Sequence, residues 1–164
     1  MTADPAPSTP HTGRRPNNHQ VNRAGRHFVA AELHRRGAED VVIATRRIDA
    51  DLTAANAPRT RRIEITVKAK TAGDWQPSTD AGVPHAPEDD PTSFWVLVDL
   101  RQSAPRYLIM PSWWIENNIY EEHQAYLGRH GGHRAQSPDS KHHRITDDRV
   151  DHWLDRWALL GIFD

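Results

Sequence analysis

The sequence predicts an α/β protein in which helices flank a mixed β-sheet, and three observations support this prediction. Apolar and polar side chains alternate from Arg61 to Lys70, which is typical of a strand with one buried face. The segment from Phe94 to Leu100 lacks such alternation, which is typical of a buried central strand. Apolar residues at helical spacing before and after these segments predict helices that cover the sheet.

Local patterns place the other elements in the order helix, three strands, loop, two strands, helix, loop and helix. The first helix is expected over 21–37, where Gly37 supplies the left-handed residue after the last turn. Pro111 and Ser112 begin the second helix, and Thr146 is expected to cap the last one. The buried face of that last helix is expected to carry Val150, Trp153, Leu154, Trp157 and Leu160. The expected strands are 41–45, 47–56, 61–70, 94–100 and 106–110, and the expected loops are 78–92 and 128–143.

The chain has 164 residues, which suffices for one domain with one core. Residues 1–18 are rich in Pro, Ser, Thr and Asn and are expected to form a disordered tail, which leaves 19–164 as the domain. The absence of cysteine excludes disulfides, thiolate zinc sites and thiol nucleophiles. No apolar run reaches the length of a membrane span and the N-terminus has no apolar signal core, so we expect a cytoplasmic protein.

The net charge of -1 conceals a strong asymmetry along the chain. Residues 14–70 contain 13 Lys and Arg against 6 Asp and Glu, whereas residues 71–164 contain 8 against 15. A basic half in a nearly neutral chain can form a local positive face for a polyanion. The alternative is an arginine-rich helix face that is simply solvated.

Asp51 and the strand 61–70 are the candidates for chemistry. A phosphodiester hydrolase needs carboxylates to hold a hard divalent cation and a further cation near the scissile phosphate. A carboxylate at one strand end, followed by a carboxylate and a lysine two residues apart on the next strand, would supply both. Asp51 and Lys68 fit the first and last positions of this arrangement, and Thr66 stands at the middle one.

On these residues the chain resembles the PD-(D/E)XK nuclease-like superfamily. The similar segments are RHFVAAEL, DLTAAN, ITVKAK, FWVLVDL, RYLIMPSWW and RVDHWLDRWALLG, and they extend from about Asn22 to Ile162. The resemblance implies a restriction-endonuclease-like core with Asp51 as the metal-binding carboxylate and Lys68 as the catalytic lysine. It also matches Glu32 to the acidic residue that many members carry on the first helix, and it implies Mg²⁺ or Mn²⁺ as the cofactor.

The chain departs from the family pattern at Thr66, where the pattern has Glu, Asp or Gln. A neutral hydroxyl cannot replace the charge of a carboxylate as a Mg²⁺ ligand. Glu64 shares the strand face with Lys68 at roughly 13 Å along the strand. Glu64 would therefore be the second metal ligand, beside Asp51, if the ion shifted along the strand.

Two functions follow from the resemblance and its departure. The first is a Mg²⁺-dependent nuclease acting on the phosphodiester bonds of DNA, rather than RNA, through Asp51, Lys68, Glu64 and Glu32. The second is a module that kept the fold without the chemistry and binds nucleic acid or a protein partner. In that case Asp51 and Lys68 could form a structural ion pair, Glu64 could pair with nearby arginines, and Glu32 could find an arginine or a backbone amide as its partner.

Aromatic and histidine side chains offer further alternatives. Trp113 and Trp114 are adjacent and cannot both face one core, so a homodimer through these residues and Tyr120 is a third hypothesis. Trp75 follows the lysine-bearing strand and is the tryptophan expected closest to the site. The histidines between His123 and His143 have some metal-like spacing, but we expect loop residues that could approach a phosphate when protonated.

Overall fold

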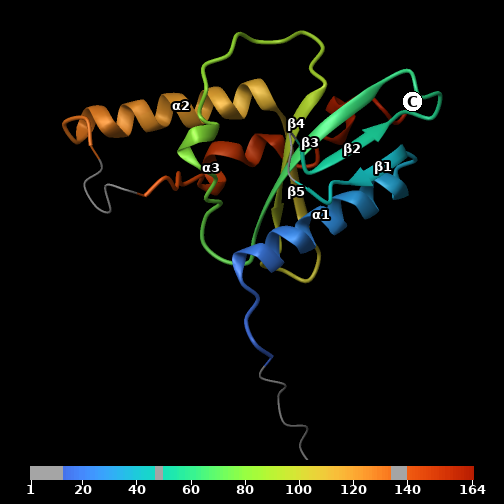
Figure 1. The fold of residues 1–164 in the computed structure, drawn as a ribbon, viewed down its shortest axis with the longest axis horizontal. Coiled ribbons are helices and arrows are strands. Elements are labelled where there is room, and N and C mark those ends of the chain that lie inside the picture. The colour runs from blue at the N-terminus through green and yellow to red at the C-terminus, as the bar shows by residue number, and fades with distance from the viewer. Residues whose placement is uncertain (1–12, 47–49, 134–139) are drawn as a thin grey trace, which may run out of the picture.

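The computed structural model describes residues 13–46, 50–133 and 140–164, and it confirms the α/β prediction. Within these residues five strands form one mixed sheet with helices on both faces (Figure 1). Most of the tail expected over 1–18 and residues 47–49 of the second expected strand lie outside the described residues. The elements are α1 (Asn18–Arg35), β1 (Glu39–Ile43), β2 (Leu52–Ala55), β3 (Arg62–Lys70), η1 (Thr79–Ala81), β4 (Ser93–Asp99), β5 (Arg106–Pro111), α2 (Ser112–Arg129), α3 (Asp147–Val150), η2 (Asp151–Trp153) and η3 (Trp157–Leu160).

The strands lie in the order in which they occur in the sequence, β1-β2-β3-β4-β5. The first three form an antiparallel meander, β4 runs parallel to β3, and β5 returns antiparallel to β4. A parallel pair requires a crossover connection, and here it is the segment 71–92, which contains only the short turn η1. The finer expectation of a restriction-endonuclease-like core remains a prediction.

The sheet separates two apolar layers. On one face, Val29 and Leu33 of α1 pack against Ile65 of β3, and the C-terminal residues Trp157 and Leu160 complete this layer. On the other face, α2, α3 and Trp75 cover Trp95, Leu97, Leu108 and Met110. The strand alternation predicted for 61–70 is therefore real, because Ile63, Ile65 and Val67 are buried against the α1 side.

Helix α1 begins three residues earlier than its apolar spacing predicts. Asn17 caps it, since its side chain accepts a hydrogen bond from the Gln20 amide while the Gln20 side chain accepts one from the Asn17 amide. At the other end, Gly37 has φ +92°, as its expected role after the last turn requires. The predicted helix was therefore correct in type and in its C-terminal stop.

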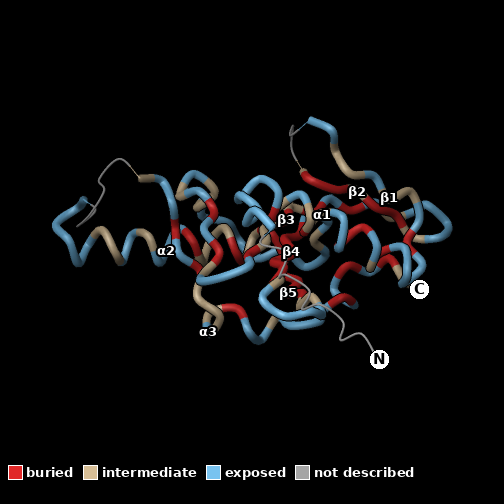
Figure 2. The backbone as a smooth tube through the Cα atoms, turned by 90° about the horizontal axis from the view of Figure 1, so that it is seen from below, coloured by how far each residue is buried: buried red, intermediate tan, exposed pale blue. Residues whose placement is uncertain are grey.

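Helix α2 is the second long helix, and it is buried over its first half only. Ile115 and Ile119 are fully buried, whereas most residues after Tyr120 are exposed, so the outer half extends away from the sheet (Figure 2). Trp113 and Trp114 are both partly buried, and Trp114 packs edge-on against Trp153 at 5.1 Å. In the described part of the chain, no helix is long and apolar enough to cross a membrane.

The single long helix predicted from Thr146 onward is wrong. The structure has α3, η2 and η3 in its place. Thr146 precedes α3 as expected, but its side chain forms no capping hydrogen bond with the described residues of α3. Asp155 interrupts the segment with φ +54°, and Leu154, expected to be buried, is 37% exposed. The residues before this break pack on one face of the sheet and those after it on the other, which a continuous helix cannot achieve.

Candidate functional site

Asp51 forms hydrogen bonds with the part of β3 that extends past the end of β2. Strand β2 begins at Leu52, opposite Ile65, so β3 continues beyond the end of its neighbour and leaves amide groups unpaired. The Val67 amide donates to Asp51 Oδ2 at 2.8 Å, and the Asp51 amide donates to the Ile65 carbonyl at 2.9 Å. Asp51 is 5% exposed, and the register places it beside Thr66. Its carboxylate thus replaces the missing strand as an acceptor.

Helix α1 supplies the next two polar contacts at this edge. Asn22 Oδ1 accepts a hydrogen bond from the Ala69 amide at 2.9 Å. One turn later, Arg26 Nε lies 3.4 Å from Asp51 Oδ1. Asn22 and Arg26 are four residues apart and therefore project from the same side of the helix. The cation found beside Asp51 is thus an arginine of α1, which sequence reasoning did not single out.

Gly25 allows α1 to approach β3 closely enough for these contacts. A Cβ atom built on Gly25 would lie 2.7 Å from the Ala69 Cβ and 3.4 Å from a Val67 methyl group. Any side chain at this position would push the helix away from the strand. The helical spacing of Gly25 with apolar residues was the sequence signal for this contact.

Glu32 lies in a different cluster, at the other end of α1. Its carboxylate accepts hydrogen bonds from Arg35 and Arg36 at 3.1 to 3.3 Å. Burial raises the pKa of Glu32, but the hydrogen bonds and charges of the two arginines outweigh burial and lower the pKa overall. Arg36 also lies over the Trp157 ring at 4.8 Å. Arginine, one of the partners expected for Glu32, is therefore the partner that the structure shows.

Tyr107, on β5, is part of this cluster and is expected to ionise only at about pH 12. Burial raises the pKa of Tyr107 to about 12, and the Glu32 charge acts in the same direction. The folded state therefore favours the neutral phenol, and the stability that Tyr107 contributes is complete below about pH 10. This stability is lost as the pH rises toward the folded-state pKa.

An absorbance titration of tyrosinate tests this prediction. The step near pH 12 should disappear in Tyr107→Phe and persist in Tyr120→Phe, because Tyr120 is an exposed residue. Survival of the late step in Tyr107→Phe would assign it to another group.

Glu64 is exposed on β3, beside Thr53 of β2 and Ser93 of β4. It lies one strand repeat before Thr66, and thus further from the Asp51 end of the strand. Among the residues that the structure describes, no group of three or more His, Asp or Glu side chains could hold a metal ion. The donor set at Asp51 therefore does not fit the Mg²⁺ site that the resemblance implies.

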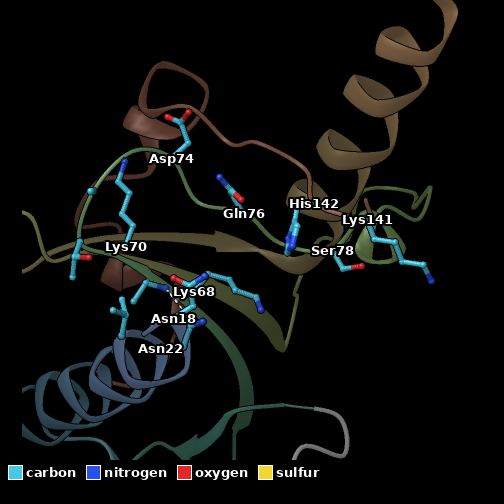
Figure 3. A pocket seen from close by; sticks show the side chains of 13 residues that line it. Asn18, Asn22, Lys68, Lys70, Asp74, Gln76, Ser78, Lys141 and His142 are labelled. Carbon is cyan, nitrogen blue, oxygen red and sulfur yellow. Dashed lines mark hydrogen bonds between the residues drawn. The ribbon is translucent and has the colours of Figure 1, made fainter. Parts of the chain in front are cut away.

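A cavity of about 520 Å³ opens beside Lys68, at the end of β3 (Figure 3). Figure 3 shows Asn18 and Asn22 of α1 on one side and Ser78, Lys141 and His142 on the other. Two short bridges, Trp75 with Ile145 and Ser78 with His142, hold the second wall together. The lining residues are Asn18, Val21, Asn22, Lys68, Ala69, Lys70, Thr71, Ala72, Asp74, Gln76, Ser78, Lys141 and His142.

The polar lining of the cavity is dominated by cations and hydrogen-bond donors. Lys68, Lys70 and Lys141 line it, and Asp74 is the carboxylate among its described lining residues. Asp74 is neutralised by Arg144 at 2.7 Å, and Lys141 lies 3.1 Å from Asp80. This balance of charge suits an anion better than a metal ion.

Lys70 forms a buried wall of the cavity. Its side chain is 2% exposed, and Nζ lies 2.5 Å from Asp147 Oδ1 and 3.6 Å from the centre of the Trp75 ring. The Arg101 guanidinium lies between two carboxylates, 2.8 Å from Asp147 Oδ2 and 2.6 Å from Asp99 Oδ2. Trp75 does lie beside the lysine-bearing strand, as predicted. Asp147, 77 residues from Lys70, left no local signal in the sequence.

No family model, curated protein or solved structure matches the chain. Membership of the nuclease superfamily therefore remains a prediction from the sequence.

Proposed function

We propose that this protein is a nucleic-acid-binding module that contacts phosphate groups without a metal ion. The observation that carries the proposal is the cavity at the end of β3, lined by Lys68, Lys141 and His142 and by the beginning of α1. The proposal corresponds to the second of the two functions that the sequence suggests, a nuclease-like fold used for binding.

The chemistry of the cavity walls supports a phosphate ligand. Phosphate oxygens accept hydrogen bonds and carry negative charge, so ammonium, amide and helix N-terminal groups are suitable partners. The Oδ1 atom of Asn22 is engaged with the Ala69 amide, so its NH₂ group is directed away from that bond and can donate to a ligand. The first turn of α1 carries no acidic side chain that would oppose an anion.

The surface around the cavity extends this positive character. Helix α1 exposes His19, Arg23 and His27 at intervals of four residues, which places them on one face. Arg14 and Arg15 precede the helix and are also exposed. A polyanion bound in the cavity could continue along this face of α1. Duplex DNA is the first ligand to test, because the superfamily resemblance is to enzymes that act on DNA.

Binding of a fluorescent DNA duplex in the presence of a chelator tests the proposal. We expect affinity to fall steeply between about 50 and about 200 mM salt, because bound phosphates release counterions. Lys68→Ala should weaken binding and reduce the slope of log K against log salt by about 1, and Lys141→Ala should act similarly. Fluorescence anisotropy measures both quantities.

Arg129→Ala is the matched control, since it removes the same charge from the exposed outer end of α2. It should leave the affinity and the slope nearly unchanged. Equal losses in Lys68→Ala and Arg129→Ala would mean that binding does not use the cavity. Salt-independent binding would contradict phosphate contact altogether.

A metal-dependent nuclease is the second candidate, and one observation favours it. Asp51 binds the Val67 amide, so this carboxylate lies at the same end of β3 as Lys68. Plasmid cleavage with Mg²⁺ or Mn²⁺, abolished by a chelator and by Lys68→Ala, would support this candidate. Intact plasmid under all these conditions, together with chelator-resistant binding, would favour the binding module.

A further inference from the structure

The feature that carries a further inference is the buried carboxylate of Asp51. A carboxylate that is 5% exposed needs compensation for its lost hydration. The Val67 amide supplies a hydrogen bond to Oδ2, but it supplies no formal charge. In nuclease-like folds a divalent ion would balance such a carboxylate. Here the neighbouring positions provide no second carboxylate, because Thr66 lies beside Asp51 and Glu64 is exposed one repeat away.

We infer that the guanidinium of Arg26 takes the place of a divalent cation at Asp51. Arg26 Nε is 3.4 Å from Asp51 Oδ1, on the carboxylate oxygen opposite the one that binds Val67. Nε is buried, and no group in the described residues forms a hydrogen bond with it. The contact is therefore a charge interaction without a directional bond. Arg26 is a positioning residue, and it neutralises Asp51 so that Asp51 can serve as the edge acceptor of β3.

The packing of α1 explains why an arginine can occupy this place. Gly25 brings the helix backbone against Ala69, and the next residue along the helix is Arg26. Asn22, one turn earlier, is fixed by its bond to the Ala69 amide. The same close approach therefore places the Asn22 side-chain oxygen at the Ala69 amide. It also places the Arg26 guanidinium beside Asp51, the carboxylate that accepts from the Val67 amide. This role is independent of whether the cavity binds nucleic acid.

Substitution of Arg26 by methionine, which keeps an apolar stem and removes the charge, tests this inference. Arg26→Met should melt at a lower temperature than the wild type, because it leaves Asp51 buried and unpaired. The loss should depend on the charge of Asp51, so Arg26→Met should lower the melting temperature much less in the Asp51→Asn background than in the wild type. Mn²⁺ should stabilise neither the wild type nor Arg26→Met, because removal of the arginine supplies no second carboxylate.

Three matched variants make the outcome specific. Arg26→Met with Asp51→Asn should melt above Arg26→Met, because the carboxylate charge has gone while an acceptor for Val67 remains. Arg26→Lys retains a cation and should recover part of the stability that Arg26→Met loses. Arg26→Gln is a milder neutral variant that should show the same dependence on Asp51 if Arg26→Met does not fold.

Two results would overturn the inference. One is a Mn²⁺-dependent rise in the melting temperature of the wild type that Asp51→Asn abolishes, because the ion would then bind beside Arg26. The other is a neutral Arg26 variant that folds and loses as much stability in the Asp51→Asn background as in the wild type, because the arginine would then not act through the Asp51 charge.

Discussion

Replacing Gly25 by alanine is expected to destabilise the folded protein by about 2 kcal/mol, even though alanine is the better helix former. The added Cβ would meet the Ala69 Cβ at 2.7 Å, and that atom is attached directly to the backbone of β3. Neither atom can rotate away, so α1 must shift from the strand. The shift would also stretch the contacts of Asn22 and Arg26 with the edge of β3. Urea denaturation measures the loss.

The control for this prediction lies in the other long helix. Gly128 is in α2, and a Cβ built there meets no described heavy atom within 4 Å. Gly128→Ala should be neutral or stabilising by up to about 1 kcal/mol, so the pair separates packing from helix propensity. Ala69→Gly should recover part of the loss in the Gly25→Ala background. Similar gains in stability from both alanine variants would refute the close contact.

Asp147→Ala is expected to cost about 3 kcal/mol, because it removes the carboxylate that contacts the buried ammonium group of Lys70. The ring of Trp75 remains, but a cation–π contact offsets only part of the lost hydration. The Asp147 side chain is 37% exposed, so solvent screening keeps the loss at the lower end of the range for buried pairs. Lys70→Met, which removes the charge and keeps much of the stem, should cost less than Asp147→Ala. Adding Asp147→Ala to Lys70→Met should then cost little more.

Acid denaturation gives an independent measurement of the same pair. Burial raises the pKa of Asp147, but Lys70 and Arg101 outweigh burial and hold the pKa below its ordinary value of 3.8. As the pH falls, the unfolded chain therefore binds this proton first, and the stability from Asp147 is present above that value and lost below it. Asp147→Ala should accordingly flatten the acid side of the stability curve. An unchanged acid limb would show that the carboxylate is not coupled to folding.

The sheet could be predicted from the sequence because its signals are local. The alternation from Ile63 to Val67 marks a strand with one apolar face, and the unbroken apolar run of β4 marks a strand covered on both faces. The C-terminal segment could not be predicted in this way. Val150 packs with α2 on one face, while Trp157 packs with α1 on the other. The apolar spacing matches a helix, but the chain must turn at Asp155 to reach both layers.

Within the candidate site, the sequence allowed only the proximity of residues on neighbouring strands to be predicted. Asp51 and Lys68 do come to the same end of β3, as the order of the strands suggested. Glu32 does not join them, because it is ten residues beyond Asn22 and thus about 15 Å further along the helix axis. The contact of Arg26 with Asp51 depends on the close approach of α1 to β3 at Gly25, and this distance cannot be read from the sequence. His142 arrives from a distant segment whose bridge to Ser78 has no local signature.

The turn at Asp155 also makes one layer of the core depend on a single short segment. Trp157, Leu160 and Ile162 close the apolar layer on the α1 side, and Tyr107 and Ile109 belong to the same layer. A proteolytic cut at the turn would therefore separate these apolar side chains from the strand that they cover. Such a cut would expose the α1 side of β5 to solvent and to association with other apolar surfaces.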